Sequence, residues 1–207
     1  MEPVNEITLL FKNLTPICGL RQRPLKLEMD STRFRRIAEY DKLRTQAKYW
    51  PWMAGLFFSS QFECGATIVS QRFVVSAAHC RGSAAFLPSE YLVTAGHTSR
   101  LLSEAKYEKG FQSFKVLQFH THPKYKRREN EFDIILIQLK SKPATYNSPA
   151  LKFGWTFTKK VQPICIDESQ PEVGPSSRCF ITGWGKTQGE RPNVGLQQAR
   201  VKARVNH

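Results

Sequence analysis

The sequence lacks an apolar run long enough to cross a membrane as a helix. Its longest apolar stretch, residues 50–58, is about half of the roughly 20 residues that a bilayer helix requires. The N-terminus also lacks a secretory signal, because Glu2 and Glu6 replace the usual basic start and the apolar region at residues 7–11 is too short. We therefore expect no transmembrane segment and no signal peptide in this chain.

Acidic residues are scarce relative to basic ones. The chain carries 31 Lys+Arg against 17 Asp+Glu, which gives a net charge of +14 and a pI near 9.8. Such a balance favours acidic partners, whether polyanions, acidic proteins or anionic lipid surfaces. We expect no specific nucleic-acid binding, because the sequence has neither zinc-finger spacing nor an aromatic RNA-binding motif.

No Cys-x-x-Cys pair occurs among the five cysteines. Two interpretations stay open from this count: five buried thiols in a cytosolic protein, or an oxidised framework in which one cysteine has no partner. His120 and His122, with His79, form at most a weak candidate for a metal site. We expect neither a metal ion nor a cofactor.

Long helical periodicity and repeats of fixed period are also missing, which argues against propellers and solenoids. From Trp50 onward the chain instead shows short β-rich runs separated by Gly, Pro, Ser and Asn. The predicted strands include residues 53–58, 66–69, 73–75, 91–95, 114–119, 134–139 and 179–182. Residues 140–163, with three prolines, are expected to form a looser connector. This pattern of short strands separated by turn residues predicts an all-β barrel or sandwich.

Three motifs then follow one another along the chain: Val-Val-Ser-Ala-Ala-His-Cys at 74–80, Phe-Asp-Ile-Ile-Leu-Ile at 132–137 and Thr-Gly-Trp-Gly-Lys-Thr at 182–187. With His-Pro-x-Tyr at 122–125, they resemble the trypsin-like serine proteases over about residues 18–204.

The resemblance implies a double β-barrel with the active site between the barrels. Residues 37 to about 140 would form a complete first barrel, and the rest an incomplete second one. We expect residues 1–36 to be a leader or propeptide-like segment and residues 37–207 a C-terminally truncated peptidase domain.

By this resemblance His79 is the general base and Asp133 the buried acid that orients it. A carboxylate that holds the proton on one ring nitrogen leaves the other nitrogen free to take a proton from serine. Taken alone, His79 would more often be a packed core residue and Asp133 a turn cap.

The Gly-Asp-Ser-Gly-Gly segment that carries the family's nucleophile does not occur in the 207 residues. Ser176 and Ser177 are poor substitutes, because they precede Cys179 on an expected inter-barrel loop. We therefore expect a serine protease homologue that is inactive as given. The alternative is a secreted trypsin-like endopeptidase whose serine lies beyond residue 207.

The resemblance favours the oxidised interpretation of the cysteines. It implies the disulfides Cys64–Cys80 and Cys18–Cys165, and it leaves Cys179 unpaired because its family partner would come later in the chain.

Processing and location follow from the same resemblance. Arg36-Ile37 matches the family's activation cleavage, although residues 38–40 lack the glycines that lend freedom to such a hinge. Asn13 begins a glycosylation sequon. The implied location is extracellular, and the implied partner is a protein substrate or a binding protein. The basic run at residues 124–128 adds a heparin-like polyanion as a further candidate.

Overall fold

The computed structural model describes residues 18–19, 43–83, 85–129, 131–141, 153–166, 178–186 and 194–202. These residues form mainly β-strands joined by short helical turns. The strands are β1 (Leu43–Arg44), β2 (Met53–Phe58), β3 (Gln61–Ile68), β4 (Phe73–Ser76), β5 (Tyr91–Ala95), β6 (Gln112–Thr121), β7 (Ile135–Leu139), β8 (Arg178–Gly183) and β9 (Gln197–Lys202). The helical turns are η1 (Ala47–Tyr49), η2 (Ala78–Arg81), η3 (Pro88–Glu90) and α2 (Leu102–Ala105).

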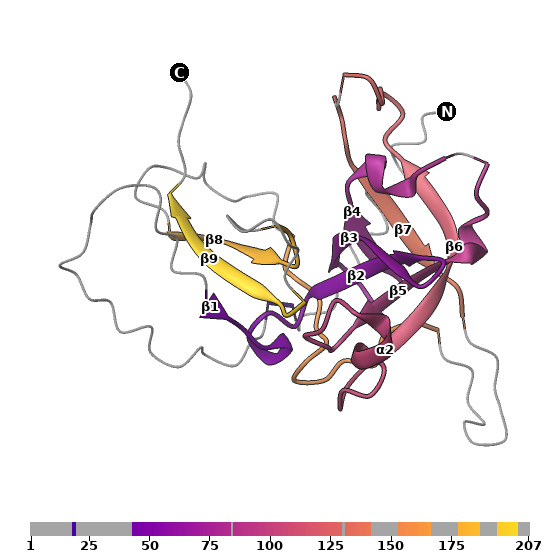
Figure 1. Ribbon diagram of the computed structural model, residues 1–207. Coiled ribbons are helices and arrows are strands. Elements are labelled where there is room, and N and C mark those ends of the chain that lie inside the picture. The colour runs from indigo at the N-terminus through magenta and orange to yellow at the C-terminus, as the bar shows by residue number, and fades with distance from the viewer. Residues whose placement is uncertain are drawn as a thin grey trace, which may run out of the picture.

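Strands β2 to β7 close into a barrel in the order β2-β3-β4-β7-β6-β5, with each neighbouring pair antiparallel. Figure 1 shows this barrel as one body, with the strands β8 and β9 beside it. Closure leaves no strand of the barrel with an unpaired edge. The predicted all-β fold with a complete first barrel is confirmed.

The barrel interior is filled by aliphatic side chains from alternating strand positions. Leu56, Ile68, Val93 and Ile137 are each 0% exposed. Burial of such a side chain contributes about 1.5–3 kcal/mol relative to its exposed state. Successive side chains of a strand point to opposite faces, so a strand such as β7 gives this core every second residue, Ile135, Ile137 and Leu139.

Part of the predicted connector at residues 140–163 belongs to this core. In the described segment 153–166, Trp155 and Val161 are both 0% exposed and pack in the barrel cluster. The Trp155 ring meets Phe114 edge-on, with the ring centroids 5.1 Å apart. The prediction of a loose connector is therefore wrong here, because single large side chains can anchor a segment that has no strand periodicity.

Gly154 makes this anchoring possible. Its φ is +148°, and a Cβ on it would lie 1.9 Å from the carbonyl oxygen of Gln71. That oxygen accepts a hydrogen bond from the Trp155 backbone N–H at 2.9 Å. Only glycine fits so close to another backbone.

A second, smaller sheet has the strand order β1-β9-β8. Leu43 pairs with Gln198, so β1 lies in this sheet although residues 37–140 were expected to form the first barrel. Beside the sheet is a second apolar cluster that contains Trp50, Met53, Trp184 and Leu196. The second barrel is thus represented by three strands among the described residues, as predicted for an incomplete barrel.

His97 connects the barrel to the second sheet. Its ring is 2% exposed and stacks on Trp184 with the centroids 5.4 Å apart. Its Nε2 lies 2.7 Å from Thr94 Oγ1, and its Nδ1 lies 2.8 Å from the carbonyl oxygen of Ser99. The carbonyl oxygen can only accept, so Nδ1 donates to it, and in the neutral ring Nε2 accepts from the Thr94 hydroxyl. Burial lowers the pKa of His97 below its ordinary 6.5.

The neutral state of His97 predicts a loss of stability on acidification. As pH falls below 6.5, the unfolded chain gains a proton on His97 that the folded chain does not, until the folded-state pKa is reached. Urea unfolding of the wild type between pH 8 and 5 should show a decline that His97→Gln reduces. His120→Gln is the control that removes another histidine but leaves this contact intact. Equal declines in wild type and His97→Gln would contradict the assignment.

The packing of the barrel predicts different costs for two leucines. Leu56 is 0% exposed and Leu117 is 45% exposed. Leu56→Ala should lower the free energy of unfolding by about 2–5 kcal/mol, because it leaves a cavity in the core. The matched variant Leu117→Ala should change it by about 0.5 kcal/mol or less. Denaturant unfolding measures both, and similar values for the two variants would show that the interior is not closely packed.

Candidate active site

The pairing of β4 with β7 brings the two predicted triad residues together. Ser76 at the end of β4 lies opposite Ile135 at the start of β7. Because the strands are antiparallel, the chain after β4 and the chain before β7 emerge at the same end of the barrel. His79 lies just beyond Ser76, and Asp133 lies just before Ile135. Residues 54 positions apart in the sequence therefore become neighbours.

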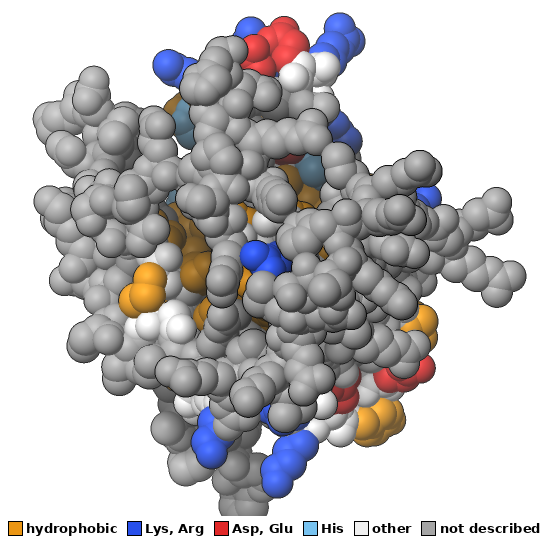
Figure 2. Space-filling model, turned by 90° about the vertical axis from the view of Figure 1, so that its left-hand side faces the viewer, with side chains coloured by type: hydrophobic (Ala, Val, Ile, Leu, Met, Phe, Trp, Pro, Cys, Tyr) orange, Lys and Arg blue, Asp and Glu red, His pale blue; other side chains and the backbone are white. Residues whose placement is uncertain are grey.

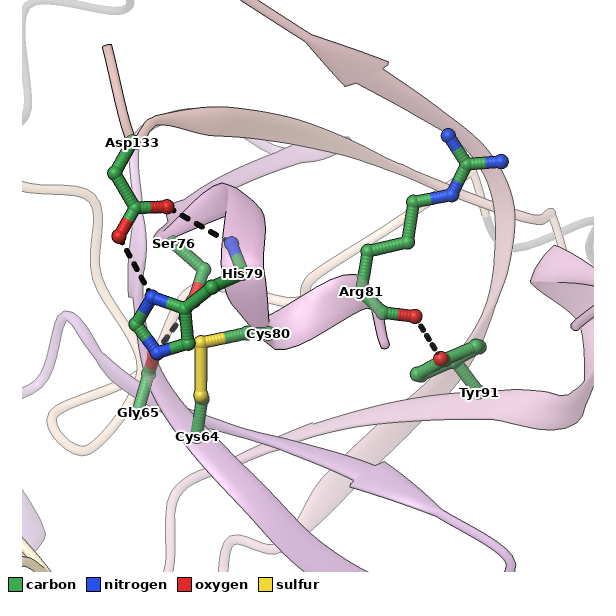
Figure 3. The surroundings of a disulfide bond; sticks show 8 residues. All are labelled: Cys64, Gly65, Ser76, His79, Cys80, Arg81, Tyr91 and Asp133. Atoms are coloured by element: carbon green, nitrogen blue, oxygen red, sulfur yellow. Dashed lines mark hydrogen bonds and ion pairs between the residues drawn. A yellow bond between two sulfur atoms is a disulfide. The ribbon is translucent and has the colours of Figure 1, made fainter. Parts of the chain in front are cut away.

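Asp133 holds His79 through two hydrogen bonds (Figure 3). Its Oδ2 lies 2.6 Å from the ring Nδ1, and its Oδ1 accepts the backbone N–H of His79 at 2.8 Å. The hydrogen bond from the His79 ring, followed by that from its backbone, lowers the pKa of the Asp133 carboxyl below its ordinary 3.8. An ionised carboxylate only accepts hydrogen bonds, so Nδ1 carries the proton.

The other ring nitrogen of His79, Nε2, points away from Asp133 and has no hydrogen-bond partner among the described residues. The side chain of His79 is 55% exposed, whereas that of Asp133 is 21% exposed. An imidazole that is oriented on one side and open on the other can accept a proton from a group that approaches from solvent.

The turn that carries His79 is braced on both sides. Cys80 forms a disulfide with Cys64 of β3, next to the imidazole (Figure 3). A bridge that closes a loop of this size contributes about 3 kcal/mol through the entropy of the unfolded chain. At the end of η2, the Tyr91 hydroxyl donates to the carbonyl oxygen of Arg81. These links fix the backbone from which the imidazole projects.

The backbone before Asp133 forms a tight turn that sequence reasoning missed. Phe132 has a φ of +53°, and its carbonyl oxygen accepts the N–H of Ile134 at 2.7 Å. A non-glycine residue in this region costs about 1–3 kcal/mol and persists only where its surroundings hold it. Here the His122 ring stacks on Phe132 at 4.8 Å, and Lys124 Nζ lies 5.6 Å from the same ring. The motifs at 122–125 and 132–137 contained these residues, but no pattern in them reveals the stacking.

One group of described residues has the spacing of a metal site, but its chemistry does not fit. Ligand atoms of Cys64, His79 and Cys80 lie within 4.8 Å of one another. Both sulfurs belong to the disulfide, whereas cysteine binds metals as a thiolate. The cluster supports the histidine backbone instead.

The remaining predicted residues fall in two groups. Cys18 and Cys165 form a disulfide that spans 147 positions, and Cys179 is a free thiol. The predicted cleavage site Arg36-Ile37, the sequon at Asn13, and Ser176 and Ser177 lie outside the described residues. Within the part of the chain that the structure describes, no helix has the length and apolarity to span a membrane.

Comparison with known proteins identifies relatives among the transmembrane serine proteases. The chain is 30% identical to human transmembrane protease serine 7 over 159 residues, which are 74% of this chain and 16% of that protein. It is 31% identical to mouse transmembrane protease serine 11C over 155 residues, 74% of this chain and 31% of that protein. Human transmembrane protease serine 11A is 30% identical over 155 residues, with coverages of 74% and 32%. The chain thus spans a third or less of these relatives.

The family described as Trypsin matches residues 41–207, which include both sheets and the site. The barrel topology and the three sequence motifs agree with this match. The chain therefore belongs to the trypsin family of serine proteases.

Proposed function

We propose that His79 and Asp133 are the general base and the orienting acid of a serine endopeptidase site. The observation that carries this proposal is the pair of hydrogen bonds from His79 to the two oxygens of Asp133. In such a site Nε2 takes the proton of a serine hydroxyl while the serine oxygen attacks the peptide carbonyl. The imidazolium then gives that proton to the leaving amine, and the carboxylate stabilises the charged ring between these steps.

We propose further that the 207 residues alone hydrolyse no peptide bond. They contain no Gly-Asp-Ser-Gly-Gly segment, and therefore neither the nucleophile nor the oxyanion donors that accompany it in the family. A base with nothing to deprotonate and no site for a developing oxyanion gives no covalent catalysis. In this form the chain is a protease homologue that binds protein partners. The alternative, an endopeptidase with its serine beyond residue 207, uses the same His79 and Asp133.

Processing and location belong to the same proposal. Cleavage between Arg36 and Ile37 would separate residues 1–36 from the peptidase domain 37–207. The bridge Cys18–Cys165 would keep the two pieces attached. Two disulfides favour an oxidising environment and hence an extracellular location. Asn13 would be glycosylated there.

Binding to heparin-like polyanions stays a weaker proposal. Within the basic run 124–128, Lys126 pairs with Glu129 at 2.8 Å and Arg127 donates to the carbonyl oxygen of Gly82 at 2.9 Å. On the face in Figure 2, the Lys and Arg side chains shown in colour lie at several separate places. The run therefore offers fewer free cations than its sequence suggests.

The missing nucleophile leads to a prediction about catalysis. Purified chain, cleaved at Arg36-Ile37, should neither label with a fluorophosphonate probe nor turn over a panel of peptide substrates. A chimera that continues the chain with the Gly-Asp-Ser-Gly-Gly segment of a family member should do both. In the chimera Asp133→Asn should lower kcat by about 10⁴-fold, because an amide favours the wrong tautomer of His79.

Two results would contradict this proposal. Stoichiometric labelling of the 207-residue chain, or turnover that His79→Ala abolishes, would show that another serine serves as the nucleophile. An active chimera that is indifferent to Asp133→Asn would remove the orienting role of the carboxylate.

The hydrogen bonds between His79 and Asp133 also predict how the Asp133 carboxyl titrates. His79→Ala removes the ring N–H that bonds to the carboxylate, so the pKa of Asp133 should rise toward 3.8. Carboxyl-carbon NMR measures this shift, and His120→Ala should leave it unchanged. Since the folded-state pKa lies below the unfolded one, the pair stabilises the fold above pH 3.8 and that stability is lost as pH falls through the folded value. An unchanged pKa in His79→Ala would mean that the hydrogen bond does not form in solution.

A further inference from the structure

A hollow of about 530 Å³ opens on the surface between the β2–β3 turn and the segment that contains α2. Neither His79 nor Asp133 lines it. Its walls include Ser60, Phe62, Arg100, Leu101, Leu102 and Lys106. Its volume falls in the range of about 300–1,000 Å³ typical of ligand sites.

The two cations of the hollow have no acidic partner. Among the described residues, neither Arg100 nor Lys106 forms an ion pair. Arg100 lies over the Phe62 ring, with Cζ 5.6 Å from its centroid. Its Nε is buried and has no hydrogen-bond partner in the described part of the chain. An anion cannot reach this enclosed Nε, so it would meet the terminal nitrogens of the guanidinium, which forms no ion pair among the described residues.

The acidic residues nearest in the sequence are occupied elsewhere. Glu104 accepts a hydrogen bond from Ser99 Oγ at 2.7 Å. The carboxylate of Glu108 accepts the backbone N–H groups of Thr98 and Ser99, at distances between 2.8 and 3.0 Å. These hydrogen bonds hold the two carboxylates on their own loop, and the described residues that line the hollow include no acidic one. Its charge is therefore positive.

The apolar walls restrict the kind of anion. Leu101 is 40% exposed, and Phe62 and Leu102 add further apolar surface. A sulfated sugar would leave these side chains uncovered, whereas a peptide can offer a carboxylate and an aliphatic side chain together. The net charge of +14 adds long-range attraction for acidic partners.

We propose that this hollow binds an acidic segment of a partner protein. Carboxylates of the segment meet Arg100 and Lys106, and a neighbouring aliphatic side chain covers Leu101. This binding needs no serine nucleophile, so it is independent of the catalytic proposal.

The test uses the full 207-residue chain and a fluorescein-labelled peptide, Glu-Leu-Asp-Leu-Glu, followed by fluorescence anisotropy. Arg100→Gln and Lys106→Gln should each weaken binding by roughly fivefold, as expected for the loss of a partly solvated ion pair. Added salt should weaken binding through screening. Leu101→Ser should also lower the affinity, which a purely electrostatic site would not show. Far-UV circular dichroism verifies that the variants are folded.

The matched control is Lys115→Gln, which removes the same charge from an exposed position on β6. Its affinity for the peptide should equal that of the wild type. Equal losses in Lys115→Gln and Arg100→Gln would overturn the proposal in favour of unspecific attraction, and so would binding of the amide peptide Gln-Leu-Asn-Leu-Gln with equal affinity. A heparin oligosaccharide that binds more tightly and loses affinity in Arg100→Gln would assign the hollow to polyanions instead. Absence of binding would reject the site.

Discussion

The antiparallel pairing of β4 with β7 is the constraint on which the site depends. It places the chain after Ser76 beside the chain before Ile135, and this adjacency lets one carboxylate reach both the ring and the backbone of His79. The register is in turn fixed by the closed barrel, because a slip of one residue would turn the buried side chains of β7 to the outside. The orientation of the imidazole is thus a consequence of core packing.

Much of the fold could be predicted from short apolar runs. The bounds of β2 and β5 were predicted to the residue. The strand predicted at 114–119 lies within β6, and the one predicted at 134–139 begins one residue before β7. The pairing of β1 with β9 could not be predicted, because a strand of two residues has no periodicity and its partner is far along the chain. The burial of Trp155 was missed because prolines around it suggested a loop, while its contact with Phe114 decides its place.

The candidate site was also predicted only in part. The motifs pointed to His79 and Asp133, and these residues do lie together. The positive φ of Phe132 and its stacking on His122 were not predictable, since both depend on how two loops meet. The hollow beside α2 was not predicted from the sequence, for a different reason. A net charge of +14 shows an excess of cations but not which of them lack an acidic partner. Among the described residues Arg100 and Lys106 form no ion pair, and Glu104 and Glu108 are hydrogen-bonded to Ser99 and Thr98.

His79 lies in η2, just after β4, and Asp133 lies just before β7, so both are carried by segments next to barrel strands. Among the described residues of the second sheet, none forms a hydrogen bond with either side chain. The barrel also carries the disulfide beside the histidine and the turn at Phe132. The second sheet adjoins the barrel where the His97 ring stacks on Trp184, a member of the second apolar cluster. Among the described residues, the imidazole is therefore oriented by segments that connect strands of the barrel. In a serine protease assembled on this plan, the second barrel has to bring the serine and the oxyanion donors to an imidazole that is already held in place.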